Sequence, residues 1–191
     1  MNTFQIWDAL HHDEFCKDKT AGVFPRDYLS KIRKRIYPFG IIINTSRASD
    51  EDGGTHWVAV WIKNEKDAEF FDSFGKTAIF YGVEIHAMIM RLAPNCEGRY
   101  KENYIQLQHP TSDLCGLFCL YYLYHKSRGY ALRRIVFNFT YPKNLKSNDA
   151  SLRRFAIKKL HSCKNARQCV DTDALNLPEM HSLKMYKVLY T

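Results

Sequence analysis

The sequence lacks both the long apolar runs of a membrane protein and the leader of a secreted one. No stretch of its 191 residues approaches the roughly 20 consecutive apolar residues that a membrane-spanning helix needs. Met1 to Gln5 have neither the basic start nor the apolar stretch of a secretory signal. We therefore expect a soluble, intracellular protein.

Internal repeats, low-complexity tracts and long linkers are also missing. The sequence predicts a single domain over residues 1–191, with about 20 C-terminal residues as a loosely docked tail. Without signs of secretion the cysteines do not indicate a disulfide framework, and we expect free thiols at Cys16, Cys96, Cys115, Cys119, Cys163 and Cys169. The last two match no standard zinc spacing, so no metal site is predicted.

Acidic residues are nearly absent from one long segment. Between Lys126 and Cys169, twelve lysines and arginines face one acid, Asp149, a local excess of +11 in a chain whose net charge is +8. A surface of this kind attracts polyanions by releasing their condensed counterions. A solvated basic face that favours solubility is an equally good interpretation.

Hydrophobic periodicity and turn residues predict a mixture of helices and short strands. Strands are expected at residues 40–44, 56–62, 68–72 and 104–108, the second and third forming a hairpin. Helices are expected at residues 3–15, 25–35, 79–92, 114–124 and 150–161.

A cysteine stands at the start of the predicted buried helix. Cys115 is followed by Gly116, which we expect to leave the sulfur open to a substrate. A helix N-terminus carries partial positive charge and free backbone N–H groups, and both stabilise a thiolate. Cys115 is therefore a candidate nucleophile, although most cysteines are simply small buried hydrophobes.

A histidine and an aspartate lie where they could serve that nucleophile. Imidazole can take the proton of a thiol and later protonate a leaving amine near neutral pH. His56 lies at a loop-to-strand junction, and Asp72 ends the next strand, where its carboxylate could hold the tautomer of the imidazole. The ordinary alternatives are one histidine among eight and a turn-initiating aspartate.

The fourth candidate is Gln108, seven residues before Cys115. A side-chain amide can donate to the oxyanion of a tetrahedral intermediate, with a backbone N–H as the second donor. A plain surface glutamine is the alternative. None of the four residues alone is strong evidence for a catalytic site, but their order and joint spacing along the chain are.

Together these segments resemble the adenovirus endopeptidase family. The strings that carry the resemblance are Asn44-Thr45, Gly53-Gly54-Thr55-His56-Trp57, residues 71–75, the segment from Gln108 to Cys119, and Leu152-Arg153-Arg154. The resemblance covers residues 24–161. The chain departs from the family in having Asp72 at the usual position of a glutamate, as ubiquitin-like-protein proteases of the same clan do.

The resemblance implies an α+β fold, a mixed sheet flanked by helices with the catalytic cysteine at the N-terminus of a central buried helix. It implies a cysteine endopeptidase that cleaves viral precursor proteins at glycine-containing sites. A deconjugating protease for ubiquitin-like modifiers would use the same catalytic set. A non-enzymatic polyanion-binding protein is the alternative that the basic segment suggests.

The resemblance also implies activators and a location. Family members are helped by DNA and by a short peptide that forms a disulfide with a non-catalytic cysteine, and Cys96 lies near the corresponding place. DNA is expected to bind the basic helix through Arg153, Arg154, Lys158 and Lys159. The implied location is the virion or the host nucleus.

Overall fold

The structure is a computed structural model that describes residues 1–50, 56–139 and 144–160. Its sheet has the strand order β1-β2-β3-β4-β5, in which β1 and β2 run parallel, β4 and β5 run parallel, and the other neighbours are antiparallel. The strands are β1 (Thr20–Pro25), β2 (Phe39–Asn44), β3 (Trp57–Ile62), β4 (Ala68–Phe71) and β5 (Lys101–Glu102).

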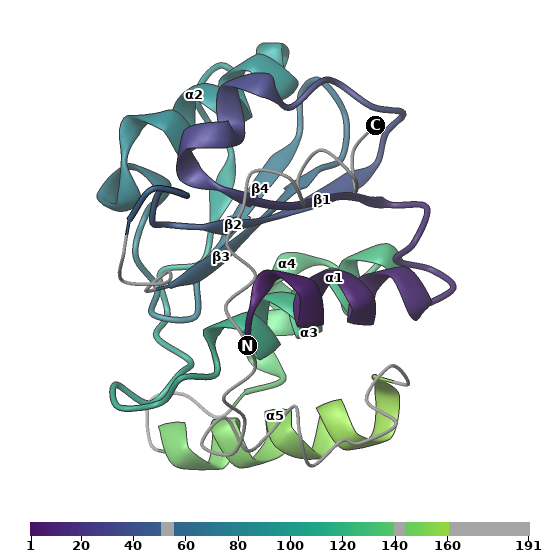
Figure 1. The fold of residues 1–191 in the computed structure, drawn as a ribbon, viewed down its shortest axis with the longest axis vertical. Helices are drawn as coiled ribbons and strands as arrows, with labels where there is room; N and C mark the ends of the chain where they lie inside the picture. Colours follow the sequence, from purple (N-terminus) through teal and green to yellow (C-terminus); the bar gives the residue numbers. More distant parts are fainter. Residues whose placement is uncertain (51–55, 140–143, 161–191) are drawn as a thin grey trace.

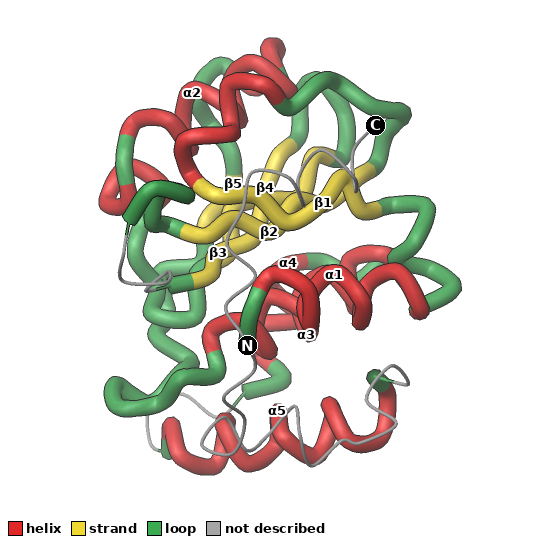
Figure 2. The backbone as a smooth tube through the Cα atoms, in the orientation of Figure 1, coloured by secondary structure: helices red, strands yellow, loops and turns green. Residues whose placement is uncertain are grey.

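Helices cover both faces of this sheet (Figures 1 and 2). The α-helices are α1 (Thr3–His12), α2 (Val83–Leu92), α3 (Cys115–Ser127), α4 (Leu132–Phe137) and α5 (Leu145–Lys159), and the 3-10 helices are η1 (Arg26–Lys31), η2 (Ala78–Tyr81) and η3 (Pro94–Cys96). One face packs on η1 and α2. The other packs on α1 and α3, with α5 beyond α3. The expected mixed α+β architecture is confirmed.

Strands β1 to β4 are largely apolar and buried without alternation because both faces of the sheet are covered. In β2, Ile42 belongs to the core shared with α1 and α3, whereas Ile41 and Ile43 belong to the core shared with η1 and α2. In β3, Ala59 and Val58 divide in the same way. The sheet is therefore the central layer of the molecule.

Helix α3 is buried on nearly all sides, as its apolar sequence predicts. Near its C-terminal end, Lys126 Nζ lies 2.9 Å from a carboxylate oxygen of Glu69, and both side chains are buried. The Tyr122 hydroxyl donates to the same carboxylate at 2.9 Å. Removing one partner of such a pair would leave an uncompensated buried charge. The pair therefore fixes α3 against β4.

The structure corrects several predicted elements. The segment expected as a helix over residues 25–35 contains only the 3-10 helix η1, which follows the unpredicted strand β1. Gly82, with a φ of 130°, divides the helix expected over 79–92 into η2 and α2. Residues 104–108 are not a strand, because the N–H groups of Leu107 and Gln108 both donate to the carbonyl of Ser73. Helix α4 was also not predicted.

The hairpin of β3 and β4, the buried helix α3 and the basic helix α5 are confirmed. Helix α1 ends at His12, before the expected residue 15. Within the described ranges, no helix is long and apolar enough to cross a bilayer. The C-terminal tail predicted from the sequence lies outside the described residues, as do Cys163 and Cys169.

Candidate active site

The hairpin brings a histidine and an aspartate together. His56 immediately precedes β3 and Asp72 immediately follows β4, and the start of one antiparallel strand lies beside the end of the other. His56 Nε2 lies 2.6 Å from Asp72 Oδ1, and the two residues are 7% and 0% exposed. The contact is a short, charge-assisted hydrogen bond shielded from water.

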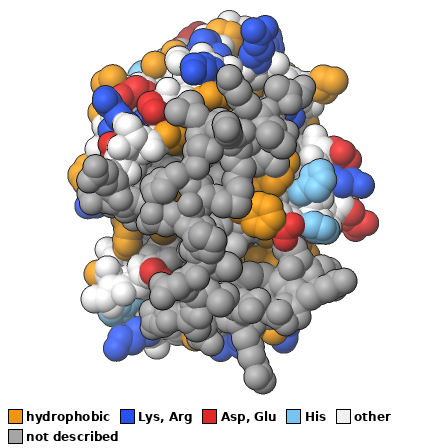
Figure 3. Space-filling model, in the orientation of Figure 1, with side chains coloured by type: hydrophobic (Ala, Val, Ile, Leu, Met, Phe, Trp, Pro, Cys, Tyr) orange, Lys and Arg blue, Asp and Glu red, His pale blue; other side chains and the backbone are white. Residues whose placement is uncertain are grey.

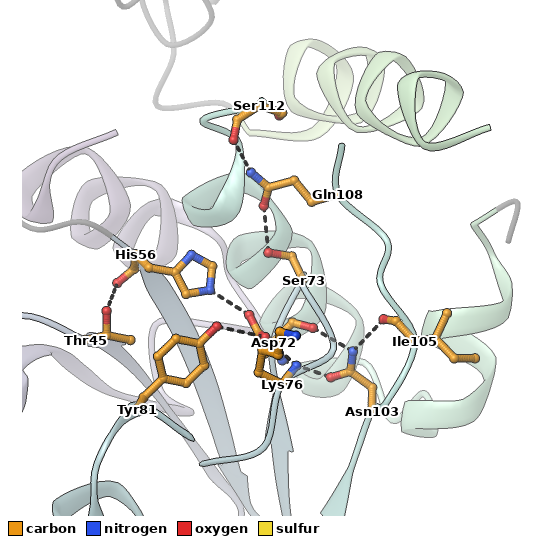
Figure 4. A network of polar contacts seen from close by, with 10 residues as sticks. All are labelled: Thr45, His56, Asp72, Ser73, Lys76, Tyr81, Asn103, Ile105, Gln108 and Ser112. Carbon is orange, nitrogen blue, oxygen red and sulfur yellow. Dashed lines mark hydrogen bonds and ion pairs between the residues drawn. The ribbon is translucent and has the colours of Figure 1, made fainter. Parts of the chain in front are cut away.

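The second carboxylate oxygen of Asp72 is also fully used (Figure 4). Oδ2 accepts from the backbone N–H of Lys76 at 2.7 Å and from the Tyr81 hydroxyl at 3.0 Å. Asn103 brackets the backbone of the same residue, accepting from its N–H at 2.9 Å and donating to its carbonyl at 2.6 Å. A buried carboxylate needs such compensation. These bonds hold the carboxylate in one orientation.

Two aromatic rings fix the plane of the imidazole. The ring centroids of Phe74 and Tyr81 lie 4.9 Å and 5.3 Å from that of His56, each at an interplanar angle of 30°. Tyr81 therefore contacts the histidine through its ring and the aspartate through its hydroxyl. Because Nε2 is bound to Asp72, the other ring nitrogen remains for the thiol.

Cys115 is the first residue of α3, and no side chain in the described part of the chain caps this helix. Its thiol lies close enough to His56 to raise the pKa of the imidazole. Burial of the imidazole lowers the pKa of His56. The hydrogen bonding and the negative charges of Asp72 and Cys115 outweigh this effect, so the pKa is raised to about 9. The arrangement therefore favours the imidazolium form of His56 beside Cys115.

One turn further on, Cys119 is unsuited to the same chemistry. Its side chain is fully buried, and burial raises the pKa of its thiol well above the usual value, with the charges of Cys115 and Asp72 adding to the rise. Of the two cysteines at the start of α3, Cys115 is therefore the better candidate nucleophile.

Gln108 is fully buried, which excludes the plain surface glutamine. Its Oε1 accepts from the Ser73 hydroxyl at 2.7 Å, and its Nε2 donates to the carbonyl of Ser112 at 2.5 Å (Figure 4). The second hydrogen of this amide has no acceptor among the described residues. Gln106, two residues earlier, donates to the carbonyl of Gln108 at 3.0 Å.

Gly116 lies in a closely packed position beside Cys115. A Cβ atom built at this position would lie 3.2 Å from Ile6 Cδ1, 3.3 Å from Met1 Cβ and 3.4 Å from Trp57 Cδ1. Glycine therefore permits a close approach of α1 and β3 to the first turn of α3, where a larger residue would require its neighbours to shift by a few tenths of an ångström. That Gly116 also leaves the sulfur open to a substrate stays a prediction.

The family model of the adenovirus endoprotease matches residues 21–141. The chain belongs to the adenovirus endoprotease family. This match includes all four residues identified from the sequence, and it confirms the resemblance on which their selection partly rested.

Individual relatives agree with this membership. The chain is 37% identical to the protease of bovine adenovirus 2 over 90 residues, or 44% of this chain and 43% of the relative. It is 34% identical to that of human adenovirus D serotype 9 over 92 residues, with the same coverage, and 28% identical to that of snake adenovirus serotype 1 over 175 residues, or 81% and 84%. The first two alignments span less than half the length of those relatives.

A solved structure has a related fold. The crystal structure of an ASFV protease aligns with a TM-score of 0.53 at 14% identity, covering 75% of this chain and 63% of that one. At this identity the likeness concerns the fold alone.

The fold does not bring the other candidate residues of this endoprotease-family chain to the active site. Cys96 ends η3 and belongs to the core on the opposite face of the sheet from α3. Its thiol is 5% exposed and contacts Met90 Sδ at 3.7 Å. A disulfide with an activator peptide stays a prediction, and it would require the side chains that cover Cys96 to move.

The basic residues predicted to bind DNA lie on α5. Arg154, Lys158 and Lys159 are exposed and Arg153 is half-buried. In Figure 3, lysine and arginine side chains are visible at separate points of the lower edge of the molecule, where α5 lies.

Two members of the basic segment are not available to a polyanion. Lys126 is paired with Glu69 in the core. The two Nη atoms of Arg128 bind the two carboxylate oxygens of Asp13, at 3.0 Å and 2.8 Å. The free positive charge of the segment is therefore smaller than the sequence count indicates.

Three polar residues of the site were missed by sequence reasoning: Ser73, Tyr81 and Asn103. Each touches a residue that was predicted, but only through the tertiary fold. The adjacency of Ser73 to Asp72 was the one available signal, and a serine in a turn sequence is too common for that signal to stand out.

Proposed function

We propose that this chain is a cysteine endopeptidase that cleaves viral precursor proteins at glycine-containing sites. The observation that carries the proposal is the buried hydrogen bond between Asp72 and His56, whose imidazole pKa is raised further by the neighbouring Cys115 at the N-terminus of α3. Membership in the adenovirus endoprotease family supports a peptidase. The preference for glycine rests on the resemblance to that family.

The chemistry follows from the order of these groups. The Cys115 thiolate attacks the scissile carbonyl carbon, forming a C–S bond and placing negative charge on the oxygen. As the tetrahedral intermediate collapses, the C–N bond breaks and the His56 imidazolium gives its proton to the leaving amine. Water then attacks the thioester, His56 takes the proton from that water, and the carboxylic acid product leaves with the sulfur restored. Asp72 orients the imidazole throughout.

Gln108 is proposed as a donor to the oxyanion, together with the backbone N–H of Cys115. Burial supports this role, since a donor screened from water stabilises a developing charge most strongly. The second hydrogen of its amide, which has no acceptor in the described part of the chain, supports it as well. A glutamine whose amide were fully paired could not take this part.

The test is covalent labelling with peptide probes that end in Gly-Gly and carry an aldehyde or a vinyl sulfone. Labelling should occur at Cys115, be abolished in Cys115→Ala and persist in Cys119→Ala. Hydrolysis of a matching Gly-Gly peptide substrate should follow the same pattern. Modification of Cys119 in place of Cys115 would contradict the assignment.

A second comparison separates the endopeptidase from a deconjugating enzyme. The same Gly-Gly vinyl sulfone can be presented on a short peptide and at the C-terminus of a folded ubiquitin-like protein. We expect comparable labelling rates from the two probes. A rate at least about tenfold higher for the folded probe would favour the deconjugating protease, because that preference requires a surface for the body of the modifier.

We also propose that α5 binds DNA as a polyanion. Its exposed cations Arg154, Lys158 and Lys159 support this, with Arg153 beside them. The location proposed for such an enzyme is the virion or the host nucleus. A peptide activator bound through Cys96 is proposed only from the resemblance.

A further inference from the structure

The side-chain amide of Gln108 is held from both ends inside the protein. Its nitrogen donates to the carbonyl of Ser112, and its oxygen accepts from the hydroxyl of Ser73. Gln108 and Ser73 are both fully buried, so water does not replace the bond between them.

The chemistry of the partners fixes which way the amide points. A backbone carbonyl can only accept, so the atom of Gln108 that faces Ser112 must be the nitrogen. The oxygen then faces Ser73, and the hydroxyl there must donate. The terminal torsion of a glutamine is soft, so without the second bond the amide plane could turn while the first bond remained.

The backbone of Gln108 is held separately. Its N–H donates to the carbonyl of Ser73 at 3.1 Å, and the N–H of Leu107 donates to the same carbonyl at 2.8 Å. Removing the serine hydroxyl therefore changes the support of the amide group but leaves these backbone bonds in place. Ser73 also directly follows Asp72, so one dipeptide contacts both the histidine and the glutamine of the site.

We propose that Ser73 is a positioning residue that orients the Gln108 amide so that its free N–H is presented to the oxyanion. This inference rests on the proposed function. Ser73 itself touches no reacting atom, and it acts only through Gln108. The alternative is that the hydroxyl merely satisfies a buried carbonyl oxygen and matters for stability alone.

The experiment uses the full chain and compares three reactions of Cys115 in the variant Ser73→Ala. Hydrolysis of a Gly-Gly peptide and binding of a Gly-Gly peptide aldehyde both place negative charge or an oxygen at the oxyanion position. Alkylation by iodoacetamide displaces iodide at a saturated carbon and needs no oxyanion donor. We expect kcat and the affinity for the aldehyde to fall about tenfold, while KM and the alkylation rate stay unchanged. This loss is smaller than the ~10²-fold or larger loss expected when an oxyanion donor is missing altogether.

The matched controls are Gln108→Ala and the double variant. If Ser73 acts through Gln108, adding Ser73→Ala to Gln108→Ala should cause no further loss of kcat. If the loss of kcat in the double variant were the product of the losses in the two single variants, the proposal would be overturned. An unchanged kcat in Ser73→Ala would also overturn it. A parallel fall in the alkylation rate would place the effect on the thiol or the fold, which also contradicts it.

A second variant covers the case in which Ser73→Ala fails to fold. Ser73→Thr keeps the hydroxyl and should retain the wild-type kcat when activity is divided by the amount of protein whose Cys115 reacts with iodoacetamide. A loss of kcat with normal alkylation would contradict the proposal. Failure of the proposed function gives a different result, because the wild-type protein itself would then leave the Gly-Gly peptide uncleaved.

Discussion

Replacing Asp72 by asparagine should disable the imidazole without removing it. The carboxylate accepts at both oxygens, from His56 on one side and from Lys76 N–H and Tyr81 on the other. A backbone N–H can only donate, so the asparagine must turn its oxygen toward Lys76 and its NH₂ group toward His56. Nε2 must then accept, which places the imidazole proton on the nitrogen that should serve the thiol.

The size of the effect comes from two changes. The rise in the pKa of His56 from 6.5 to about 9 corresponds to a stabilisation of the imidazolium by about 3 kcal/mol. Asp72 and Cys115 together provide this stabilisation, against the opposing effect of burial. Without Asp72 two of the effects that raise this pKa are lost, so the pKa falls. The wrong tautomer adds to the loss, so kcat should fall about 10²- to 10⁴-fold and leave residual activity.

The assay is hydrolysis of a Gly-Gly peptide by Asp72→Asn, with His56→Ala and Asp72→Glu as companions. His56→Ala should be the most severe, and Asp72→Glu should be partly tolerated because it keeps the charge but adds a methylene to a closed site. Equal inactivity of Asp72→Asn and His56→Ala would refute the reasoning and give Asp72 a structural or more direct chemical part. Unchanged activity in Asp72→Asn would refute it outright.

Three further results are expected. Cys115→Ala should abolish peptide hydrolysis while Cys119→Ala retains it, measured with melting curves to confirm folding, and the reverse pattern would exclude Cys115 as nucleophile. Because the pKa of His56 is raised in the folded state, its contribution to folding stability should be complete below about pH 6.5 and be lost as the pH rises through about 9. Peptide hydrolysis should decline over the same alkaline range. A free energy of unfolding, measured with urea, that increased over this range would contradict the prediction. In the variant that carries alanine at Arg153, Arg154, Lys158 and Lys159, the slope of the logarithm of DNA affinity against the logarithm of salt concentration should become less steep by about 3, while peptide hydrolysis without DNA is unchanged. An identical slope would mean that these cations of α5 serve only solubility.

Local pattern alone was enough to predict the central elements of this protein. The apolar run of α3 and the hairpin of β3 and β4 are continuous in sequence, and their burial follows from composition. The short strings around His56, Asp72, Gln108 and Cys115 carried the resemblance to the adenovirus endoprotease family, which the family model confirms. The mixed α+β fold was expected from that resemblance.

Tertiary structure alone decided how these residues are supported. The partners of the site come from distant segments, as with Asn103 on Asp72 and Ser73 on Gln108, and local periodicity carries no information about such contacts. The same holds for β1, whose parallel pairing with β2 leaves no hairpin signal between them. It holds too for Lys126, counted with a basic surface but buried against Glu69, because the sequence records a charge and only the fold supplies its partner.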